Sequence, residues 1–158
     1  MKLVLFRHGK AQADAPKGDF ARHLVTSGRD AVEQVGKRLL TEGISGARAL
    51  VSPSARTAET LESLPEGLIA STEIEWVDSL YNGSVDAVLE AISSHENDAT
   101  VVVIGHNPGI TATALYLLDQ PGPLTSSMKP GDAVMLDLDR IGRGTARLVS
   151  YHRRPETR

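Results

Sequence analysis

The stretch TVVVIGHNPG, residues 100–109, decides the fold of this chain. Its first half is a continuous run of apolar, mostly β-branched residues, which is typical of a strand that is buried on both faces. Its second half contains Asn107, a residue that can cap a helix, and Pro108, which is favoured at the first position of a helix. A buried strand that leads directly into a helix indicates a parallel sheet with crossover helices, and we expect this strand to be central in it.

The segments on both sides of this stretch alternate between strand and helix patterns. Apolar residues at helical spacing predict a helix from about Thr26 to Gly43, a second from Ser54 to just before Pro65, and a third over 85–92. Strands are predicted over 2–6, 47–51, 73–77, 133–138 and 146–151, with the last two forming a closing hairpin. The predicted fold class is therefore α/β, a single three-layer domain with a mostly parallel sheet of about five or six strands and helices on both faces.

The length and composition fit one soluble domain. The chain has 158 residues, of which 41% are hydrophobic and 23% are charged, and we expect a single domain over residues 1–158. No apolar run approaches the roughly 18 residues that cross a bilayer. The apolar run after Lys2 is too short for a secretory signal, so we interpret it as a strand and expect a cytoplasmic protein.

Cysteine content and net charge exclude several classes of function. The chain contains no cysteine, which excludes disulfide scaffolds, thiolate zinc sites and thiolate nucleophiles. Its net charge of −3 lacks the broad basic field that sequence-independent nucleic-acid binding requires. Neither nucleic acid nor a membrane is expected as a partner. Six arginines and no lysine follow Leu138, which we interpret as a solvated edge strand with a frayed tail, in preference to a patch that meets an acidic partner.

Three predicted strands end in the same kind of polar group. The first strand leads into Arg7 and His8, the second into Ser54 and Arg56, and the central strand into His106. Because ligands in open α/β sheets bind beyond the carboxyl ends of the strands, these side chains are expected to share one site. Arginine offers a planar fork of donors that matches phosphate oxygens, and a helix N-terminus adds backbone donors. The pattern therefore predicts a site for a phosphoryl group.

A histidine is the candidate nucleophile of this site. Imidazole is nucleophilic near neutral pH and can carry phosphate on nitrogen, and no cysteine is available to do so. His8 lies between Arg7 and Gly9, whose missing side chain lets the backbone approach a ligand. None of the five histidines belongs to an HxH, HxxxH or carboxylate-rich pattern, so we expect neither a metal nor another cofactor.

Three motifs in this order resemble the histidine phosphatase superfamily, which is also called phosphoglycerate-mutase-like. They are the RHG triplet at 7–9, an SPxxRTxxT stretch at 52–60 and a VVxxGHNPG stretch at 101–109. The short chain and a few further residues are similar to the small phosphohistidine phosphatase branch typified by SixA. The resemblance covers roughly residues 1–118, and these further residues are Asp19, Arg22, Leu24, Gly28, Leu80 and Tyr81.

The resemblance implies a two-step reaction without a metal. His8 would be the nucleophile, Arg7 and Arg56 would clamp the phosphoryl oxygens, and His106 would donate a further hydrogen bond to the transferring group. Gly9, Asn107 and Arg22 are further candidates for binding the substrate, with Arg22 at the pocket mouth. The implied substrate is a phosphorylated protein that carries phosphohistidine, or a small phosphorylated molecule.

The general acid is the part of the pattern that departs from the larger members of the superfamily. Where those members have a glutamate after the third strand, the nearest acid here is Asp78, about one residue out of register. An alkoxide leaving group needs a strong proton donor, whereas an imidazole nitrogen leaves more readily. A weak acid thus favours phosphohistidine as substrate. The alternatives are a phosphatase of small phosphomonoesters and a catalytically weak, phosphate-binding regulatory module; a mutase ranks below them because the chain lacks long insertions.

Overall fold

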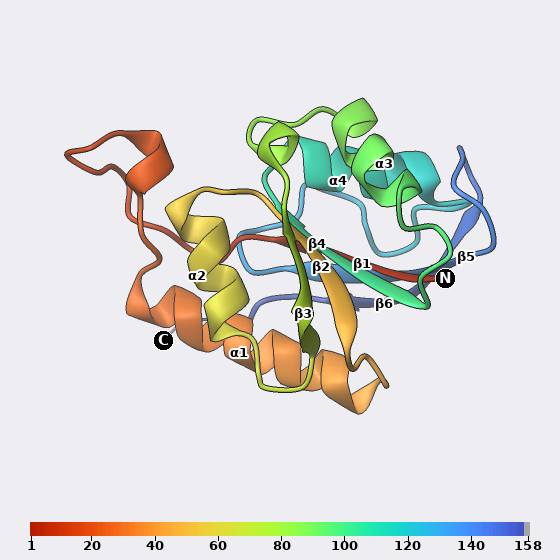
Figure 1. The fold of residues 1–158 in the computed structure, drawn as a ribbon, viewed down its shortest axis with the longest axis horizontal. Coiled ribbons are helices and arrows are strands. Elements are labelled where there is room, and N and C mark those ends of the chain that lie inside the picture. The colour runs from red at the N-terminus through yellow and green to blue at the C-terminus, as the bar shows by residue number, and fades with distance from the viewer. Residues whose placement is uncertain (157–158) are drawn as a thin grey trace.

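Two pairs of helices cover the two faces of a six-stranded sheet in the computed structural model, which describes residues 1–156 (Figure 1). The last of the C-terminal arginines, at position 158, lies outside the described residues. The strands are β1 (Lys2–Arg7), β2 (Ala47–Val51), β3 (Ile69–Trp76), β4 (Thr100–Gly105), β5 (Ala133–Leu138) and β6 (Ala146–His152). The α-helices are α1 (Thr26–Thr41), α2 (Ala55–Ser63), α3 (Val85–Ser93) and α4 (Gly109–Leu117), and short 3₁₀ helices lie at η1 (Asp19–Ala21) and η2 (Asp78–Leu80).

The sheet has the order β3-β2-β4-β1-β5-β6 and is mostly parallel. β4 pairs in parallel with β1 on one side and with β2 on the other, so the apolar run at 100–104 is central as predicted. β5 is antiparallel to both of its neighbours, which gives the predicted closing hairpin with β6. The predicted α/β class with helices on both faces is confirmed.

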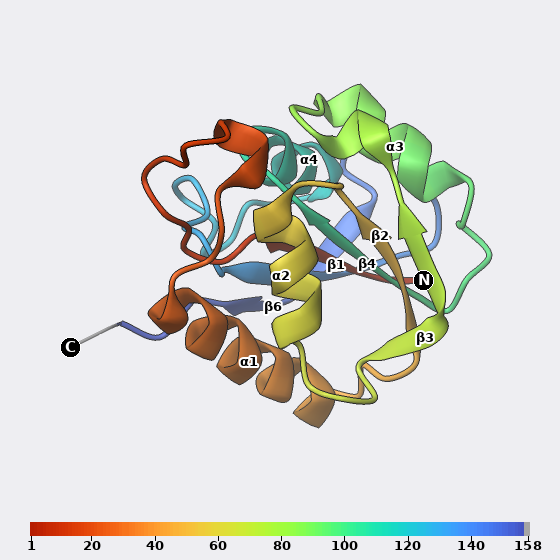
Figure 2. The same ribbon diagram turned by 60° about the vertical axis from the view of Figure 1, so that its left-hand side comes forward.

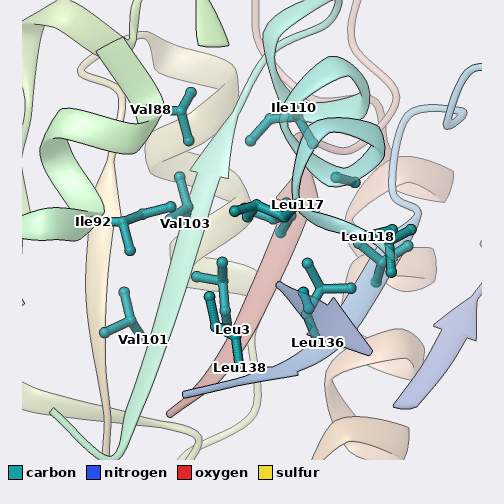
Figure 3. Packing of buried hydrophobic residues seen from close by; sticks show 14 of the residues in the cluster. Leu3, Val88, Ile92, Val101, Val103, Ile110, Leu117, Leu118, Leu136 and Leu138 are labelled. Carbon is teal, nitrogen blue, oxygen red and sulfur yellow. The ribbon is translucent and has the colours of Figure 1, made fainter. Parts of the chain in front are cut away.

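Alternate residues of the central strands belong to two separate hydrophobic clusters, one on each face of the sheet. Leu3 and Leu5 of β1 face one cluster, whereas Val4 and Phe6 face the other, and all four are completely buried. α3 and α4 close the first cluster, where Ile92 and Leu117 pack against strand residues (Figure 3). α1 and α2 close the second. This two-sided burial is the reason that the strands appear in the sequence as continuous apolar runs.

The element boundaries differ from the predicted ones at one strand and one helix. β3 begins at Ile69, four residues earlier than expected. It is an edge strand, and its register against β2 shifts between Ala47 and Ala49. Its buried and exposed residues therefore do not alternate regularly, and the sequence gives no clear signal for its start. α4 begins at Gly109 and not at Pro108. Pro108 is therefore the N-cap in place of Asn107, although the side chain of Asn107 still accepts a hydrogen bond from the backbone N–H of Thr111 in the first turn (3.2 Å).

The prolines and glycines of the segment 119–132 and its lack of periodicity predict a surface loop, and this prediction is wrong in part. It forms no helix or strand, but its side chains Leu124 and Met128 are almost completely buried in the cluster beneath α3 and α4. The prolines and glycines that suggested a loop hide this anchoring, because two isolated apolar residues give no periodicity. The segment is therefore fixed to the core.

The parallel strands direct their carboxyl ends to one edge of the sheet. The loop between β1 and α1, which carries η1, stands at this end (Figures 1 and 2). Within residues 1–156 no helix is both long enough and apolar enough to cross a membrane.

Candidate active site

A pocket of about 580 Å³ opens at the carboxyl ends of β1 and β4 and the start of α2. It collects Arg7, His8, Arg56 and His106, the four residues that the sequence motifs place at strand ends. The rings of His8 and His106 lie 5.3 Å apart between centroids. The other residues that line the pocket are Lys10, Ala11, Asp19, Arg22, Tyr81, Asn82, Asn107 and Pro130.

His8 is held as a neutral imidazole with one nitrogen available for reaction. Its Nδ1 lies 2.7 Å from the carbonyl oxygen of Gly9, and because a carbonyl only accepts, Nδ1 must carry the proton. The lone pair is therefore on Nε2. Burial lowers the pKa of His8 to about 4, and the nearby guanidinium groups of Arg56 and Arg7 contribute in the same direction. At neutral pH the ring is thus uncharged, with Nε2 free of a proton and able to act as a nucleophile.

The two arginines of the site are held by oxygens of surrounding loops. Arg7 Nη1 donates to the carbonyl oxygen of Met128 (2.7 Å). Arg56 is buried and donates from Nη1 to the carbonyl oxygen of Asp19 (2.8 Å) and from Nη2 to its carboxylate (3.1 Å). Burial lowers the pKa of Arg7, although the nearby Asp132 opposes this effect. Both guanidinium groups are therefore preorganised, since each is fixed in place without a ligand.

His106 is oriented by Ser52. Its Nε2 lies 2.8 Å from the hydroxyl oxygen of Ser52, and both side chains are buried. Burial lowers the pKa of His106 to about 3, with a further contribution from His8, so this ring is also neutral near pH 7. When the Ser52 hydroxyl donates to Nε2, the proton of His106 is on Nδ1, which becomes a hydrogen-bond donor for a ligand.

The SPxxRTxxT segment is a rigid scaffold for the site. Ser54 caps α2 by accepting from the backbone N–H of Thr57 (3.3 Å), and this places Arg56 in the first turn. The Thr60 hydroxyl donates to the carbonyl oxygen of Arg56 (2.7 Å) and accepts from the backbone N–H of Gly9 (2.9 Å). The last threonine of the motif thereby connects the arginine to the loop that carries the nucleophile.

Three nitrogens of the site are buried and have no hydrogen-bond partner within residues 1–156. They are Nε of Arg7, Nε of Arg56 and Nδ1 of His106, and only one other buried side-chain polar atom of that part of the chain, Oγ1 of Thr113, is in the same condition. A buried polar group without a partner is costly, and such groups are rare outside functional sites. An oxyanion with several acceptor oxygens would supply partners for all three.

A hydrogen-bond network at the pocket mouth fixes the loop between β1 and α1. The carboxylate of Asp19 accepts from Tyr81 Oη (2.5 Å), Arg22 Nη1 (2.9 Å) and Arg56 Nη2 (3.1 Å). These bonds, that of Tyr81 above all, hold the pKa of Asp19 well below its usual range, so Asp19 is ionised and cannot donate a proton. Arg22 lines the pocket as predicted, and its Nε donates to the carbonyl oxygen of Gln12 (2.7 Å).

Three predicted site residues lie elsewhere or are already fully engaged. Gly9 does not line the pocket, because its N–H and carbonyl are bound to Thr60 and His8. Asn107 lines the pocket, but its amide donates to Ser127 and Met128 and accepts from Thr111, so it supports the 119–132 segment. Asp78 begins η2 with an exposed side chain and is not among the lining residues. Within residues 1–156, Asp19 is the only carboxylate of the lining.

The motifs did not predict four contributors to the site. Tyr81 packs its ring edge against His106 with 5.5 Å between centroids, and Ser52 and Thr60 make the bonds described above. Met128 provides the carbonyl that holds Arg7. The Ser and Thr positions belong to the SPxxRTxxT motif and could have been found by asking which polar side chains of that motif are buried. Met128 acts through its backbone, which gives no sequence signal.

Among residues 1–156, no group of three or more histidine or acidic side chains is placed to hold a metal ion. In this part of the chain, four of the five charged residues that line the pocket are cations, namely Arg7, Lys10, Arg22 and Arg56, which suits an anion.

Comparison with known proteins places this arrangement in a family. No model of a known protein family matches the chain. The phosphohistidine phosphatase SixA of Escherichia coli (strain K12) is 31% identical over 149 residues, covering 92% of this chain and 90% of that protein. The solved SixA homologue of Nakamurella multipartitia has a TM-score of 0.81 and 26% identity over 97% of this chain and 95% of its own. A structure of the protein histidine phosphatase SixA complexed with tungstate has a TM-score of 0.79 and 26% identity, with 97% of each chain covered. The chain therefore belongs to the SixA phosphohistidine phosphatase family within the histidine phosphatase superfamily.

Proposed function

We propose that this protein is a metal-independent phosphatase that removes phosphate from phosphohistidine in a protein, with His8 as the nucleophile. The observation that carries the proposal is the neutral imidazole of His8 beside three buried nitrogens that lack partners, on Arg7, Arg56 and His106. The SixA relatives carry the same activity in their names, and one of them binds tungstate, a tetrahedral oxyanion like phosphate. We place the reaction in the cytoplasm.

The first step transfers the phosphoryl group from substrate to enzyme. The lone pair on Nε2 of His8 attacks phosphorus, and the N–P bond of the substrate breaks as the N–P bond to His8 forms. The leaving imidazole takes the bonding electron pair and departs neutral when its other nitrogen is protonated. Arg7, Arg56 and Nδ1 of His106 hold the three phosphoryl oxygens as negative charge spreads over them.

The second step hydrolyses the phosphorylated enzyme. Water attacks phosphorus in the same donor set, and the N–P bond of His8 breaks to release inorganic phosphate and regenerate the neutral ring. The bond between Nδ1 of His8 and the carbonyl of Gly9 keeps the ring in one orientation through both steps.

Phosphohistidine is favoured over a small phosphate ester because the pocket offers no carboxylic acid. Asp19, the carboxylate of the lining, is ionised by its bonds to Tyr81, Arg22 and Arg56, and Asp78 lies outside the lining. An ester would have to release an alkoxide without a proton donor, whereas imidazole leaves without one. The regulatory, non-catalytic alternative is disfavoured because a pure phosphate-binding module does not require a neutral imidazole beside the anion.

The test is to trap the intermediate. The wild-type protein is mixed with a phosphohistidine peptide that carries ³²P and is quenched at alkaline pH, where phosphohistidine is stable. We expect labelled protein that loses its label in acid, and we expect turnover to persist in excess EDTA. His8→Ala should abolish both label and turnover while it keeps the fold by circular dichroism. Full turnover by His8→Ala would refute the mechanism.

A further inference from the structure

A second pocket lies beside the active-site pocket and carries three cations. It has a volume of about 510 Å³, and its basic side chains are Lys129, Arg153 and Arg154. Lys129 precedes β5 and the two arginines follow β6, and Ala133 pairs with His152 where these strands meet. The pocket is therefore at the same end of the sheet as His8. Its other lining residues are Pro123, Ser126, Ser127, Asp132, Tyr151 and Glu156.

The two pockets share a wall. Ser127 of this basic pocket accepts a hydrogen bond from Nδ2 of Asn107, which lines the active-site pocket (2.7 Å). Lys129 is adjacent to Pro130, which also lines the active-site pocket. A ligand that occupies the active site and extends past Pro130 thus reaches the basic pocket.

The buried carboxylate of Asp132 fixes the backbone of this pocket. It accepts from the backbone N–H of Arg154 (2.7 Å), from the backbone N–H of Lys129 (2.9 Å) and from the Tyr151 hydroxyl (2.9 Å). Asp132 is 2% exposed and its oxygens are bound to these donors. The carboxylate therefore fixes the backbone at Lys129 and Arg154, so the chain directly after β6 is not the frayed tail expected from the sequence, while the side-chain charges of the cations stay available for a ligand.

The three cations of the basic pocket are not neutralised by salt bridges within residues 1–156. Lys129, Arg153 and Arg154 form no ion pair with any carboxylate of residues 1–156, whereas Arg29 and Arg48 on other faces are paired with glutamates. The protein as a whole has a net charge of −3. Three cations against the carboxylates of Asp132 and Glu156 leave a small local excess of positive charge beside the active site, and such an excess steers ligands of opposite charge toward it.

We propose that the basic pocket binds the carboxylates of an acidic segment next to the phosphorylated histidine of a partner protein. This inference rests on the proposed function and adds the chemical class of the substrate around the phosphohistidine. The cations belong to a solvent-open pocket, and Lys129 and Arg153 are exposed. None of the buried nitrogens that lack partners belongs to a residue lining this pocket. This environment suits carboxylates on a protein surface, whereas a tightly held oxyanion would need buried donors such as those around His8.

The experiment compares two phosphohistidine peptides of equal length. One carries aspartate and glutamate beside the phosphohistidine, and the other carries asparagine and glutamine at the same positions. We expect the wild type to prefer the acidic peptide by roughly tenfold in kcat/KM at low salt, because several exposed charge pairs add modestly. We expect this preference to fall steeply as salt screens the charges.

Two charge-matched double variants localise the effect. Lys129→Gln with Arg153→Gln removes the two exposed cations and should remove most of the preference while it leaves turnover of the neutral peptide unchanged. Lys2→Gln with Arg140→Gln removes the same charge at the opposite end of the sheet and should keep the preference. Equal turnover of the two peptides by the wild type, or an equal loss of preference in both double variants, would overturn the proposal.

A binding measurement separates this inference from the proposed function. If the wild type hydrolyses neither peptide, the proposed function fails. The inference is then decided by the affinity of the unphosphorylated acidic peptide, measured by fluorescence anisotropy. That affinity should be lower for Lys129→Gln with Arg153→Gln than for the wild type. Equal affinity would refute the pocket as an acidic-segment site, and stronger competition by a single-stranded oligonucleotide would show that the occupant is not a protein.

Discussion

Arginines at the two ends of the sheet are in opposite situations. At the amino end, Arg48 of β2 is paired with Glu73 (2.5 Å) and Asp98 (2.6 Å), and the hydrogen bond to Asp98 raises its pKa. At the carboxyl end, Arg7 is held by a neutral carbonyl and burial lowers its pKa. Arg56 keeps a buried Nε without a partner within residues 1–156, although its outer nitrogens contact Asp19.

This comparison distinguishes arginines whose hydrogen bonds are satisfied within the fold from arginines that keep a donor available for a ligand. An exposed ion pair such as that of Arg48 has its partners already and contributes little to stability. A buried guanidinium with an unused donor is unfavourable in the free protein, and under the proposed function the phosphoryl group would complete its hydrogen bonds. Replacement of an arginine by alanine should therefore lower activity at the carboxyl end and leave it unchanged at the amino end.

The largest effect is expected from Arg56→Ala. Loss of a preorganised donor should lower kcat for phosphohistidine by on the order of 10²-fold or more. Arg48→Ala is the matched control at the other end and should leave kcat unchanged. The test is to measure kcat of both variants by steady-state kinetics and to verify their folding by circular dichroism. A similar loss of kcat in the two variants would remove the distinction between the ends.

A smaller effect is expected at Ser52, which acts through His106. Ser52→Ala removes the partner of Nε2, so the proton of His106 is no longer confined to Nδ1. We expect kcat to fall about two- to tenfold, the usual worth of one hydrogen bond. Because ¹⁵N chemical shifts distinguish the tautomers of the His106 ring, they should change in this variant. An unchanged tautomer together with unchanged kcat would show that Ser52 does not orient the ring.

The pH dependence gives a third test. His8 should titrate with a pKa of about 4 and His106 with a pKa of about 3, far below the ordinary imidazole value of 6.5. The unfolded chain takes up protons near pH 6.5 while the folded site does not, so the free energy of unfolding should fall as the pH drops below that value. NMR titration of the ring protons measures both pKa values. In Arg56→Ala the pKa of His8 should rise, because a neighbouring positive charge is lost. Titration of both rings near pH 6.5 would contradict the neutral buried pair.

The smallest effect is expected at Asp78. Its exposed position outside the pocket lining predicts that Asp78→Asn barely alters phosphohistidine hydrolysis and does not selectively slow phosphate esters. A working general acid would be worth roughly 10² to 10⁴ in rate on esters. Assays with both substrate types for wild type and variant decide the point. A large ester-selective loss would instead favour the small-phosphomonoester phosphatase.

The elements that could be predicted from sequence are those with a clear period. Examples are the central run at 100–104, the apolar face of α1 and the Ser54 cap of α2. In each of them the local sequence favours the same structure that the packing of the whole chain requires. The start of β3 could not be predicted because an edge strand with a register shift has no alternation. The anchoring of Leu124 and Met128 was missed because both are isolated apolar residues in a segment rich in proline and glycine.

The site was predictable to the extent that its residues follow strands directly. Arg7, His8, Arg56 and His106 converge because parallel strands end at one edge. Asp19 and Tyr81 are 62 positions apart in the sequence and meet through exposed loops. No local sequence pattern predicts a contact over that separation. Gly9 and Asp78 are expected at the ligand from their places in the family pattern, but neither lines the pocket, and only residues near them such as His8 and Tyr81 do so.

The pairing of β1 also determines when the protein becomes active during its synthesis. Lys2 pairs with Thr100 and Asp137, and no strand made earlier than β4 lies beside β1. A ribosome adding about 5–20 residues per second needs on the order of 5 to 30 seconds to make the chain that completes this pairing. During that interval the apolar strand that precedes His8 has no neighbours in the sheet. A chain truncated before β4 would thus hold the nucleophile but no site, and would expose an aggregation-prone strand to the chaperones of the cell.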